Sequence, residues 1–158
     1  MQKKPFSLTA LMVACSIFAS DPGSTAVSGA KWLPKGNVSV TVIPSEHKSS
    51  EALRIADASA ARGFASAVRQ EIQQGKTYEF SGFLKSADGK PHSTKLMVAV
   101  YNAEGKMFNW IGIAIIKTGN EWTPFRIILK PDMLKNVASM APAIFPEDKA
   151  SDTGAVLA

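Results

Sequence analysis

Cysteine is nearly absent from this sequence of 158 residues, in which Cys15 is the only one. The chain can therefore form no internal disulfide bond and hold no zinc ion through several cysteines. Histidine is almost as rare, because His47 and His92 are the only two and both lie among polar, turn-forming residues. A Ser-His-Asp triad or a histidine-based metal site would have to be built from these two. We expect both to be solvated loop residues.

Long runs of charged or apolar residues are missing as well. The net charge of +5 comes from lysines and arginines that are scattered along the chain, with no run that would follow a phosphate backbone. Nucleic acid is therefore not an expected partner. No apolar stretch reaches the about 20 residues that a membrane-spanning helix needs. The content of 46% hydrophobic and 20% charged residues is typical of one ordinary globular domain.

The sequence also lacks the common patterns of catalytic residues. No glycine-rich phosphate loop precedes a helix, and no G-x-S-x-G nucleophile elbow occurs. Most acidic residues fall in turns or at strand ends rather than in a pair suited to glycoside hydrolysis. The prediction is a protein that is not an enzyme.

The first twenty residues have the pattern of an export segment. Lys3 and Lys4 give a positive start, and residues 6–14 form an apolar stretch of the right length. This pattern predicts a signal peptide over residues 1–20 and a secreted, periplasmic or cell-surface protein. A buried N-terminal helix of the domain is the alternative interpretation of the same residues.

Two cleavage sites remain open within this segment. Residues 12–15 (Met-Val-Ala-Cys) resemble a bacterial lipobox, in which Cys15 would be lipidated and become the mature N-terminus. The other site follows a small residue near Ala19 or Ser20. The only expected contact with a membrane is a lipid anchor at Cys15.

Strands account for nearly all of the remaining sequence. Residues 21–31 are rich in Gly, Ser, Thr and Pro and are predicted to be a linker. Alternating apolar and polar residues between turn residues then predict strands, although 64–72 also suits a helix. The predicted strands are 37–43, 52–55, 64–72, 77–85, 95–101, 108–116, 122–129 and 137–145. Without a 3.6-residue period, a βαβ alternation or a repeat, this order predicts an all-β sandwich or barrel.

Several of these segments also follow one known family in order. Residues 75–85 (GKTYEFSGFLK) resemble the "GktYtfSgwvK" segment of jelly-roll carbohydrate-binding modules of the family 4, 9 and 22 type, which are galactose-binding-domain-like. Upstream, Trp32 and residues 47–55 fit the family's early tryptophan and its "hsGkysLrv" stretch. Downstream, residues 119–125 fit its "t-x-x-W-t-x-f" strand.

The resemblance implies a two-sheet jelly-roll β-sandwich over residues 32–158. It implies a non-catalytic domain that binds a polysaccharide or surface glycan, in some members as an accessory to a glycoside hydrolase. No cofactor is expected, although some members hold a structural calcium ion whose ligands are unknown here. One departure from the family is the missing Asn-Phe-Glu opening before Trp32, and another is an end at Ala158 where the family continues. Three interpretations of this end stay open: the last strand is short, the reading frame ends early and truncates it, or a strand of a partner completes the sandwich.

A sugar site needs exposed aromatic faces and planar polar side chains. Trp110 is the leading candidate, because strand parity groups it with Phe108, Gly112 and Ala114, and small neighbours leave room for a ligand; a core position is the alternative. The further candidates share predicted strand positions or, in one case, a loop-like Lys-Trp-Leu-Pro context. They are Asn109, Tyr101, Phe83, Arg126, Gln70 and Trp32.

Two functions therefore stay open at this stage. One is an exported domain that binds a glycan through an aromatic cleft. The other is a structural or adhesion lipoprotein at the cell surface that uses the same sandwich for protein contacts. The position of Trp110, in a cleft or in the core, is expected to separate the two.

Overall fold

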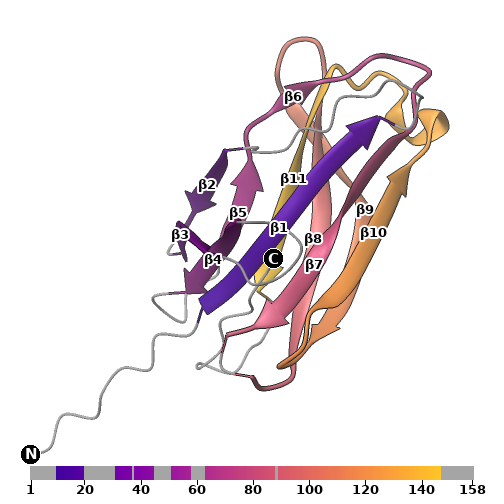
Figure 1. Ribbon diagram of the computed structural model, residues 1–158. Coiled ribbons are helices and arrows are strands. Elements are labelled where there is room, and N and C mark those ends of the chain that lie inside the picture. Colours follow the sequence, from indigo (N-terminus) through magenta and orange to yellow (C-terminus); the bar gives the residue numbers. More distant parts are fainter. Residues whose placement is uncertain are drawn as a thin grey trace, which may run out of the picture.

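The computed structural model describes residues 10–19, 31–36, 38–44, 51–57, 63–87 and 89–146, and these form two β-sheets packed face to face (Figure 1). All the strand pairs are antiparallel. The single described helix is a short 3-10 turn, η1 (Pro131–Leu134). None of the described residues forms a helix long and apolar enough to cross a membrane. The prediction of an all-β, two-sheet sandwich is confirmed.

Sheet A has five strands in the order β10-β7-β1-β4-β3. Their bounds are β1 (Ala10–Ala19), β3 (Val38–Pro44), β4 (Glu51–Asp57), β7 (Tyr78–Ser86) and β10 (Thr123–Leu129). In the view of Figure 1, β1, β7 and β10 lie in front of the second sheet.

Sheet B has the order β2-β5-β11-β8-β9, with β6 paired to β11 beyond β5. Its strands are β2 (Trp32–Lys35), β5 (Phe64–Ala67), β6 (Gln70–Glu71), β8 (His92–Tyr101), β9 (Met107–Thr118) and β11 (Ser139–Pro146). Sheet B carries the candidate site described below.

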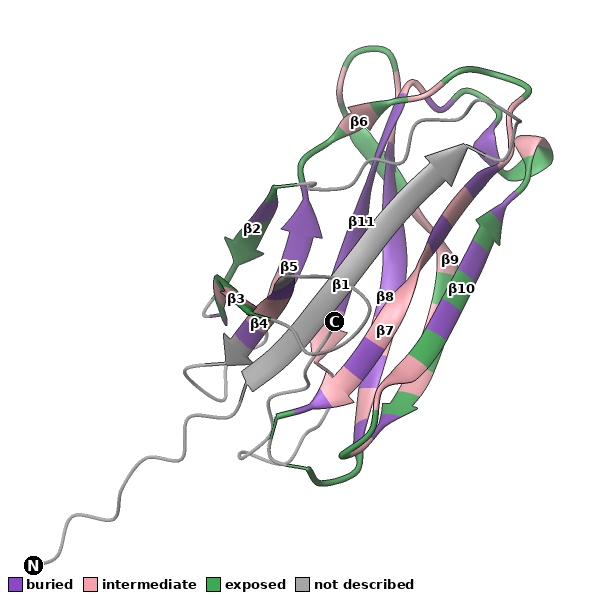
Figure 2. Cartoon of the chain, viewed as in Figure 1, coloured by how far each residue is buried: buried purple, intermediate pink, exposed green. Residues whose placement is uncertain are grey.

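The core lies between the two sheets and follows the period of two. On β10 the residues Phe125, Ile127 and Leu129 are buried while the residues between them are exposed, which Figure 2 shows as alternating bands. Phe80 of β7 lies near the centre, with its ring 5.0 Å from that of Phe125 and 6.5 Å from that of Trp32 (centroid distances). Large aromatic rings from both sheets thus close the interior.

The predicted strands agree with the structure in position, with two differences. Residues 64–72 divide into β5 and β6, and Trp32, predicted to lie in a loop, begins β2. His92, expected to be solvated, is buried at the start of β8. The linker residues 21–30, His47 and residues 147–158, with the predicted truncated strand, lie outside the described residues.

β1 changes the predicted start of the domain. The sequence predicts a sandwich that begins at Trp32, but Ala10–Ala19 form the middle strand of sheet A, paired with β4 on one side and β7 on the other. Cys15 lies within β1, opposite Gly82. A run of apolar residues suits a buried strand as well as an export segment, so composition alone does not separate them. Removal of residues 1–20 stays a prediction, and it would take β1 out of sheet A.

Candidate functional site

The outer face of sheet B, which points away from the core, has a floor of small side chains. Directly opposed residues of antiparallel strands point to the same side of the sheet. Val98 and Val100 of β8 face the core, so Ala99 between them faces outward, together with its β11 partner Ala141. The small residues of this floor are buried although they face away from the core, and one larger buried side chain, Met97 of β8, lies among them opposite Ala143. The small residues are Ser66, Ala99, Ser139, Ala141 and Ala143. Larger side chains on the same face must therefore cover them.

Three half-buried aromatic rings from three strands stand over this floor. Phe64 of β5 stacks on Phe145 of β11, with centroids 4.5 Å apart and planes at 22°. Trp110 of β9 meets both rings edge-on, with centroid distances of 6.0 Å to Phe64 and 5.5 Å to Phe145. We call these three residues the aromatic cluster.

A β-bulge at Gly112 gives Trp110 its outward direction. Leu96 and Val98 of β8 both face the core, yet their β9 partners Ala114 and Ile111 are three residues apart, so one residue is inserted between them. Gly112 has φ +59°, and a β-carbon there would lie 2.8 Å from Ile127 Cγ2. Only glycine fits such a position.

The bulge corrects the predicted parity of β9. Trp110 was expected to share a face with Ala114, but Ala114 packs against the core while Trp110 faces outward opposite Ala99. The small residues that leave room beside Trp110 come from β5, β8 and β11 instead of from its own strand.

Tyr101 lies on the same face, near the hairpin between β8 and β9. It is opposite Ser139, and the guanidinium carbon of Arg69 lies 3.7 Å from the centre of its ring. This is cation–π geometry. The hairpin itself is closed by Asn102, whose Oδ1 accepts a hydrogen bond of 2.9 Å from the backbone N–H of Lys106.

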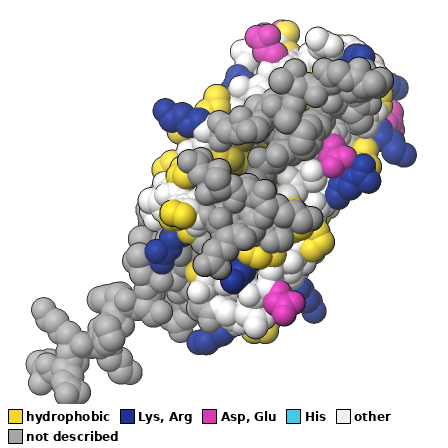
Figure 3. Space-filling model, in the orientation of Figure 1, with side chains coloured by type: hydrophobic (Ala, Val, Ile, Leu, Met, Phe, Trp, Pro, Cys, Tyr) yellow, Lys and Arg dark blue, Asp and Glu magenta, His cyan; other side chains and the backbone are white. Residues whose placement is uncertain are grey.

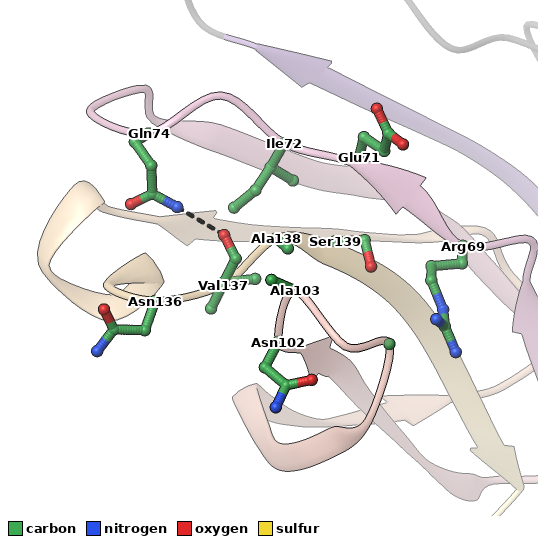
Figure 4. Close-up of a pocket in the computed structure, with 11 residues that line it drawn as sticks. Arg69, Glu71, Ile72, Gln74, Asn102, Ala103, Asn136, Val137, Ala138 and Ser139 are labelled. Carbon is green, nitrogen blue, oxygen red and sulfur yellow. Dashed lines mark hydrogen bonds between the residues drawn. The ribbon is translucent and has the colours of Figure 1, made fainter.

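A pocket of about 820 Å³ adjoins this end of the face (Figure 4). The segment around β6, the β8–β9 hairpin and the loop from η1 to β11 form its walls. Arg69 and Ser139 line the pocket and also lie along the outer face of sheet B. The polar side chains that line it are Arg69, Glu71, Gln74, Asn102, Asn136 and Ser139. Gln74 is held in place because its Nε2 donates a 2.5 Å hydrogen bond to the carbonyl of Val137.

The structure divides the predicted ligand-binding residues into three groups. Trp110 and Tyr101 share the outer face of sheet B. Asn109 is exposed beside Trp110, and its Oδ1 accepts a hydrogen bond from the Trp110 N–H. Gln70 of β6 is the cross-strand partner of Met140. Met140 is in turn opposite Val100, and Val100 is opposite Asn109. These four residues all belong to sheet B.

The other three candidates lie on the outer face of sheet A or in the core between the sheets. Phe83 and Arg126 are on the outer face of sheet A, where Phe83 is opposite Pro124. Trp32 is only 8% exposed and packs near Phe80 between the sheets, so it is a core residue rather than the wall of a cleft. Its place on β2, opposite Ala67, turns its ring inward.

On sheet A, Arg126 forms an ion pair with Glu79. The Nε of Arg126 donates a 2.9 Å hydrogen bond to Glu79 Oε2, and Arg126 Nη2 lies 2.8 Å from the same oxygen. The hydrogen bond from Arg126 lowers the pKa of Glu79 below its ordinary value, although partial burial of the carboxylate opposes the shift. Arg126 is thus engaged with Glu79 instead of with the site on sheet B.

Sequence reasoning missed Phe64, Phe145 and Arg69. Parity along each strand groups Phe64 with Ser66 and Phe145 with Ala143, which is a readable pattern of an aromatic ring beside small residues. The sequence pattern does not show which strands are neighbours in the sheet, because β5, β11 and β9 are far apart in sequence. A structural calcium ion stays a prediction. Among the described residues, no three His, Cys, Asp or Glu side chains gather as a metal site.

No protein-family model matches the chain, and no curated protein matches it in sequence. Solved structures do resemble it. The CBM22-1 xylan-binding domain of Paenibacillus barcinonensis Xyn10C superposes with a TM-score of 0.59 at 16% identity, covering 88% of this chain and 85% of that one. A further xylan-binding domain from CBM22 gives 0.52 at 17% identity, covering 82% and 83%.

The CBM22-1 and GH10 modules of the Clostridium thermocellum xylanase Xyn10B, complexed with xylohexaose, give a TM-score of 0.54 at 18% identity, covering 77% of this chain and 23% of that one. At these identities the likeness concerns the fold. The resemblance seen in the sequence is therefore confirmed at that level: the chain has the jelly-roll fold of these carbohydrate-binding modules.

Proposed function

We propose that this chain is a non-catalytic carbohydrate-binding domain that holds a polysaccharide against the outer face of sheet B. A sugar ring offers apolar C–H faces and a rim of hydroxyl groups, so it binds where aromatic rings adjoin planar polar side chains. The observation that carries the proposal is the aromatic cluster of Phe64, Trp110 and Phe145 over a floor of alanine and serine.

The polar groups lie where a chain running along this face would reach them. From the aromatic cluster, such a chain would pass Tyr101 with its stacked Arg69 and then enter the pocket. Asn102 and Asn136 at the pocket offer both donors and acceptors to hydroxyl groups. Xylan is the first polysaccharide to test, because the similar structures include xylan-binding domains and one complex with xylohexaose.

A binding role fits the pocket better than hydrolysis. Glycoside hydrolysis by the usual mechanisms needs two carboxyl groups on opposite sides of the scissile bond. Among the described residues that line the pocket, Glu71 is the only one with a carboxylate.

The test is binding of the full chain to a panel of xylans, β-glucans and other polysaccharides, by affinity electrophoresis and calorimetry. Trp110→Ala should reduce affinity by at least tenfold. Phe83→Ala, a half-buried aromatic on the outer face of sheet A, is the matched control and should bind as the parent does. A folded parent protein that binds no polysaccharide in the panel would refute the proposal.

One observation favours the alternative of a surface domain that acts through protein contacts. Ile113 and Ile115 are 60% and 61% exposed on β9, at the edge of sheet B and on the same outward side as Trp110. Exposed apolar side chains on an edge strand are typical of protein docking surfaces. Ile115→Thr should leave glycan affinity nearly unchanged if the surface binds sugar, and it should weaken capture of a protein partner under the alternative.

Export to a compartment where polysaccharide is met belongs to the same proposal. Its support is the positive and then apolar pattern of residues 1–20. The mass of the protein purified from its native source, with or without lipid on Cys15, tests this part directly.

A further inference from the structure

Arg69 is held in one position at the edge of the pocket. Its guanidinium carbon lies 3.7 Å from the ring centre of Tyr101. It also approaches the β8–β9 hairpin, where a β-carbon built on Gly105 would lie 3.1 Å from Arg69 Nη1. Gly105 has φ +76°, and its N–H donates a 3.0 Å hydrogen bond to the carbonyl of Asn102, which fixes the turn. The ring and the hairpin together position the guanidinium group.

A carboxylate lines the same pocket. Glu71 of β6 is the cross-strand partner of Ser139, and Ser139 is the partner of Tyr101. Because adjacent strands are about 4.8 Å apart, the backbones of Glu71 and Tyr101 are separated by about 10 Å, with Ser139 between them. Arg69 and Glu71 are both exposed, so a ligand from solution can reach them (Figure 4). The pocket thus combines a group that only donates hydrogen bonds with a group that only accepts them.

The other long polar side chains of the pocket are amides, which both donate and accept. Asn102 Oδ1 accepts the N–H of Lys106, and Gln74 Nε2 donates to the carbonyl of Val137. Asn136 has φ +62°, a left-handed conformation that asparagine adopts more readily than most residues. Hydrogen bonds therefore orient two of these amides, and the backbone sets the position of the third.

Arg126 of sheet A provides a comparison for Arg69. Arg126 Nη2 lies 2.8 Å from the carboxylate of Glu79, so its donors point to an acid of the same face. In the space-filling view from the side of sheet A, acidic and basic side chains both appear on the visible surface (Figure 3). Arg69 is instead stabilised by an aromatic ring, which contacts the face of a guanidinium group, whereas the N–H donors lie in the plane of that group.

We infer that the pocket is a subsite for one sugar unit whose neighbouring hydroxyl groups are free, and that Arg69 is its specificity-determining residue. This inference rests on the proposed function and adds to it the substitution state of the sugar. A hydroxyl group can accept from Arg69 and donate to Glu71, whereas a charged group would be attracted by one and repelled by the other.

The geometry of the guanidinium group gives the pocket its selectivity. Its fork of parallel N–H donors matches two acceptor oxygens that lie side by side, as the oxygens of neighbouring ring hydroxyls do. An ester on one of these hydroxyls removes the proton that Glu71 would accept and adds bulk beside Arg69. Chains that carry such esters should therefore bind less tightly than unsubstituted chains.

The experiment compares polysaccharides that have free hydroxyl groups with the same polysaccharides after acetylation, using the full-length protein. The pairs are deacetylated xylan with the same xylan acetylated at O2 and O3, and a soluble β-glucan with its acetylated form. Calorimetric titration gives the affinities. Arg69→Lys keeps the positive charge but removes the planar fork, and Arg126→Lys on sheet A is the matched control.

Gly105→Ala tests the positioning of Arg69 without replacing it, because the added β-carbon would displace Arg69 Nη1. Gly89→Ala is its control. Gly89 has φ +71°, so the backbone strain is similar, and its β-carbon would make an ordinary contact of 3.6 Å with Asn120 Cβ. Gly89 precedes β8 and Gly105 follows it, so the two glycines lie at opposite ends of that strand. The urea midpoints of the two variants should agree.

The expected result is an affinity about tenfold higher for the free member of a pair, the effect of one hydrogen bond to a charged group. Arg69→Lys and Gly105→Ala should reduce this preference to about twofold or less, because a displaced or unforked cation no longer pairs with two oxygens. Arg126→Lys and Gly89→Ala should keep it.

Equal affinity for the free and acetylated members of both pairs would overturn the inference, and so would a preference that Arg69→Lys keeps. If binding in that case still depends on Trp110, the proposed function stands. Glucuronoxylan and its carboxyl-reduced form are a third pair. Tighter binding of the acidic form that Arg69→Lys abolishes would show that the guanidinium binds a carboxylate, which also overturns the inference. Absence of binding to every polysaccharide would remove the inference and the proposed function together.

Discussion

The indole ring of Trp110 meets the ring of Phe145 edge-on, with centroids 5.5 Å apart and planes at 76°. The two residues belong to β9 and β11, which β8 separates, so their contact spans the strand that lies between them. Ala99 of β8 is the direct partner of Trp110 and is only 2% exposed. A small side chain at this position lets the two rings meet.

Ala99→Leu should therefore close the floor beneath the aromatic cluster. The added atoms would push Trp110 out of its contact with Phe145, so we expect a loss of polysaccharide affinity of at least tenfold. Overpacking of a buried position should also lower the free energy of unfolding by about 1–3 kcal/mol. Calorimetric titration and urea unfolding measure the two effects. Ala87→Leu, in the exposed turn after β7, is the control and should change neither.

Gly112→Ala should destabilise the domain by about 2 kcal/mol or more. Its positive φ disfavours any other residue, and the added β-carbon would lie 2.8 Å from Ile127 Cγ2 and 2.9 Å from Leu129 Cδ2. Gly119→Ala is the control, because no atom lies within 4 Å of its added β-carbon and its φ is not in the left-handed region. Equal urea midpoints for the two variants would contradict the role given to the bulge.

Deletion of residues 1–20 separates the two assignments of this segment. It should unfold or strongly destabilise the domain if β1 belongs to the mature protein, and it should leave the domain folded if the segment is removed on export. β1 pairs with β7 over nine positions and with β4 over four, so its loss leaves two strands of sheet A with unpaired backbone groups. A chain that starts at Ala10 keeps β1 and serves as the control. Circular dichroism and thermal unfolding compare the two. An equally stable chain that starts at Asp21 would show that β1 is dispensable and would favour removal of the segment on export.

Replacement of Glu79 should change how stability depends on pH. The hydrogen bond from Arg126 lowers the pKa of Glu79 in the folded state. The ionised carboxylate therefore stabilises the fold at any pH above the ordinary pKa of 4.5, and this contribution is lost as the pH falls through the lowered pKa. The urea midpoint of Glu79→Gln should lie furthest below that of the parent at pH 6, and the difference between the two midpoints should decrease toward pH 3. Arg126→Gln, which removes the partner instead of the carboxylate, should show the same dependence of its difference from the parent on pH.

The sequence by itself was enough for the fold class and for most strand positions. The period of two and the turn residues are local properties, so β3, β7, β8, β9, β10 and β11 were predicted within a few residues of their bounds. Burial of Tyr78 and Phe80 also follows from parity along β7. The run Gly75 to Lys85 gave the resemblance that the solved structures confirm for the fold.

The candidate site depended on tertiary structure. Trp110 and Tyr101 were predicted from single strands, but their neighbours Phe64, Phe145 and Arg69 come from segments distant in sequence. Pairing between strands far apart in the chain depends on the whole fold, and no local pattern encodes it. The bulge at Gly112 also reversed the parity of β9, because one inserted residue turns every later side chain to the other face. The pairing of Ala10–Ala19 with β4 and β7 was likewise decided by the tertiary structure, because an apolar run becomes a strand only when neighbouring strands are there to pair with it.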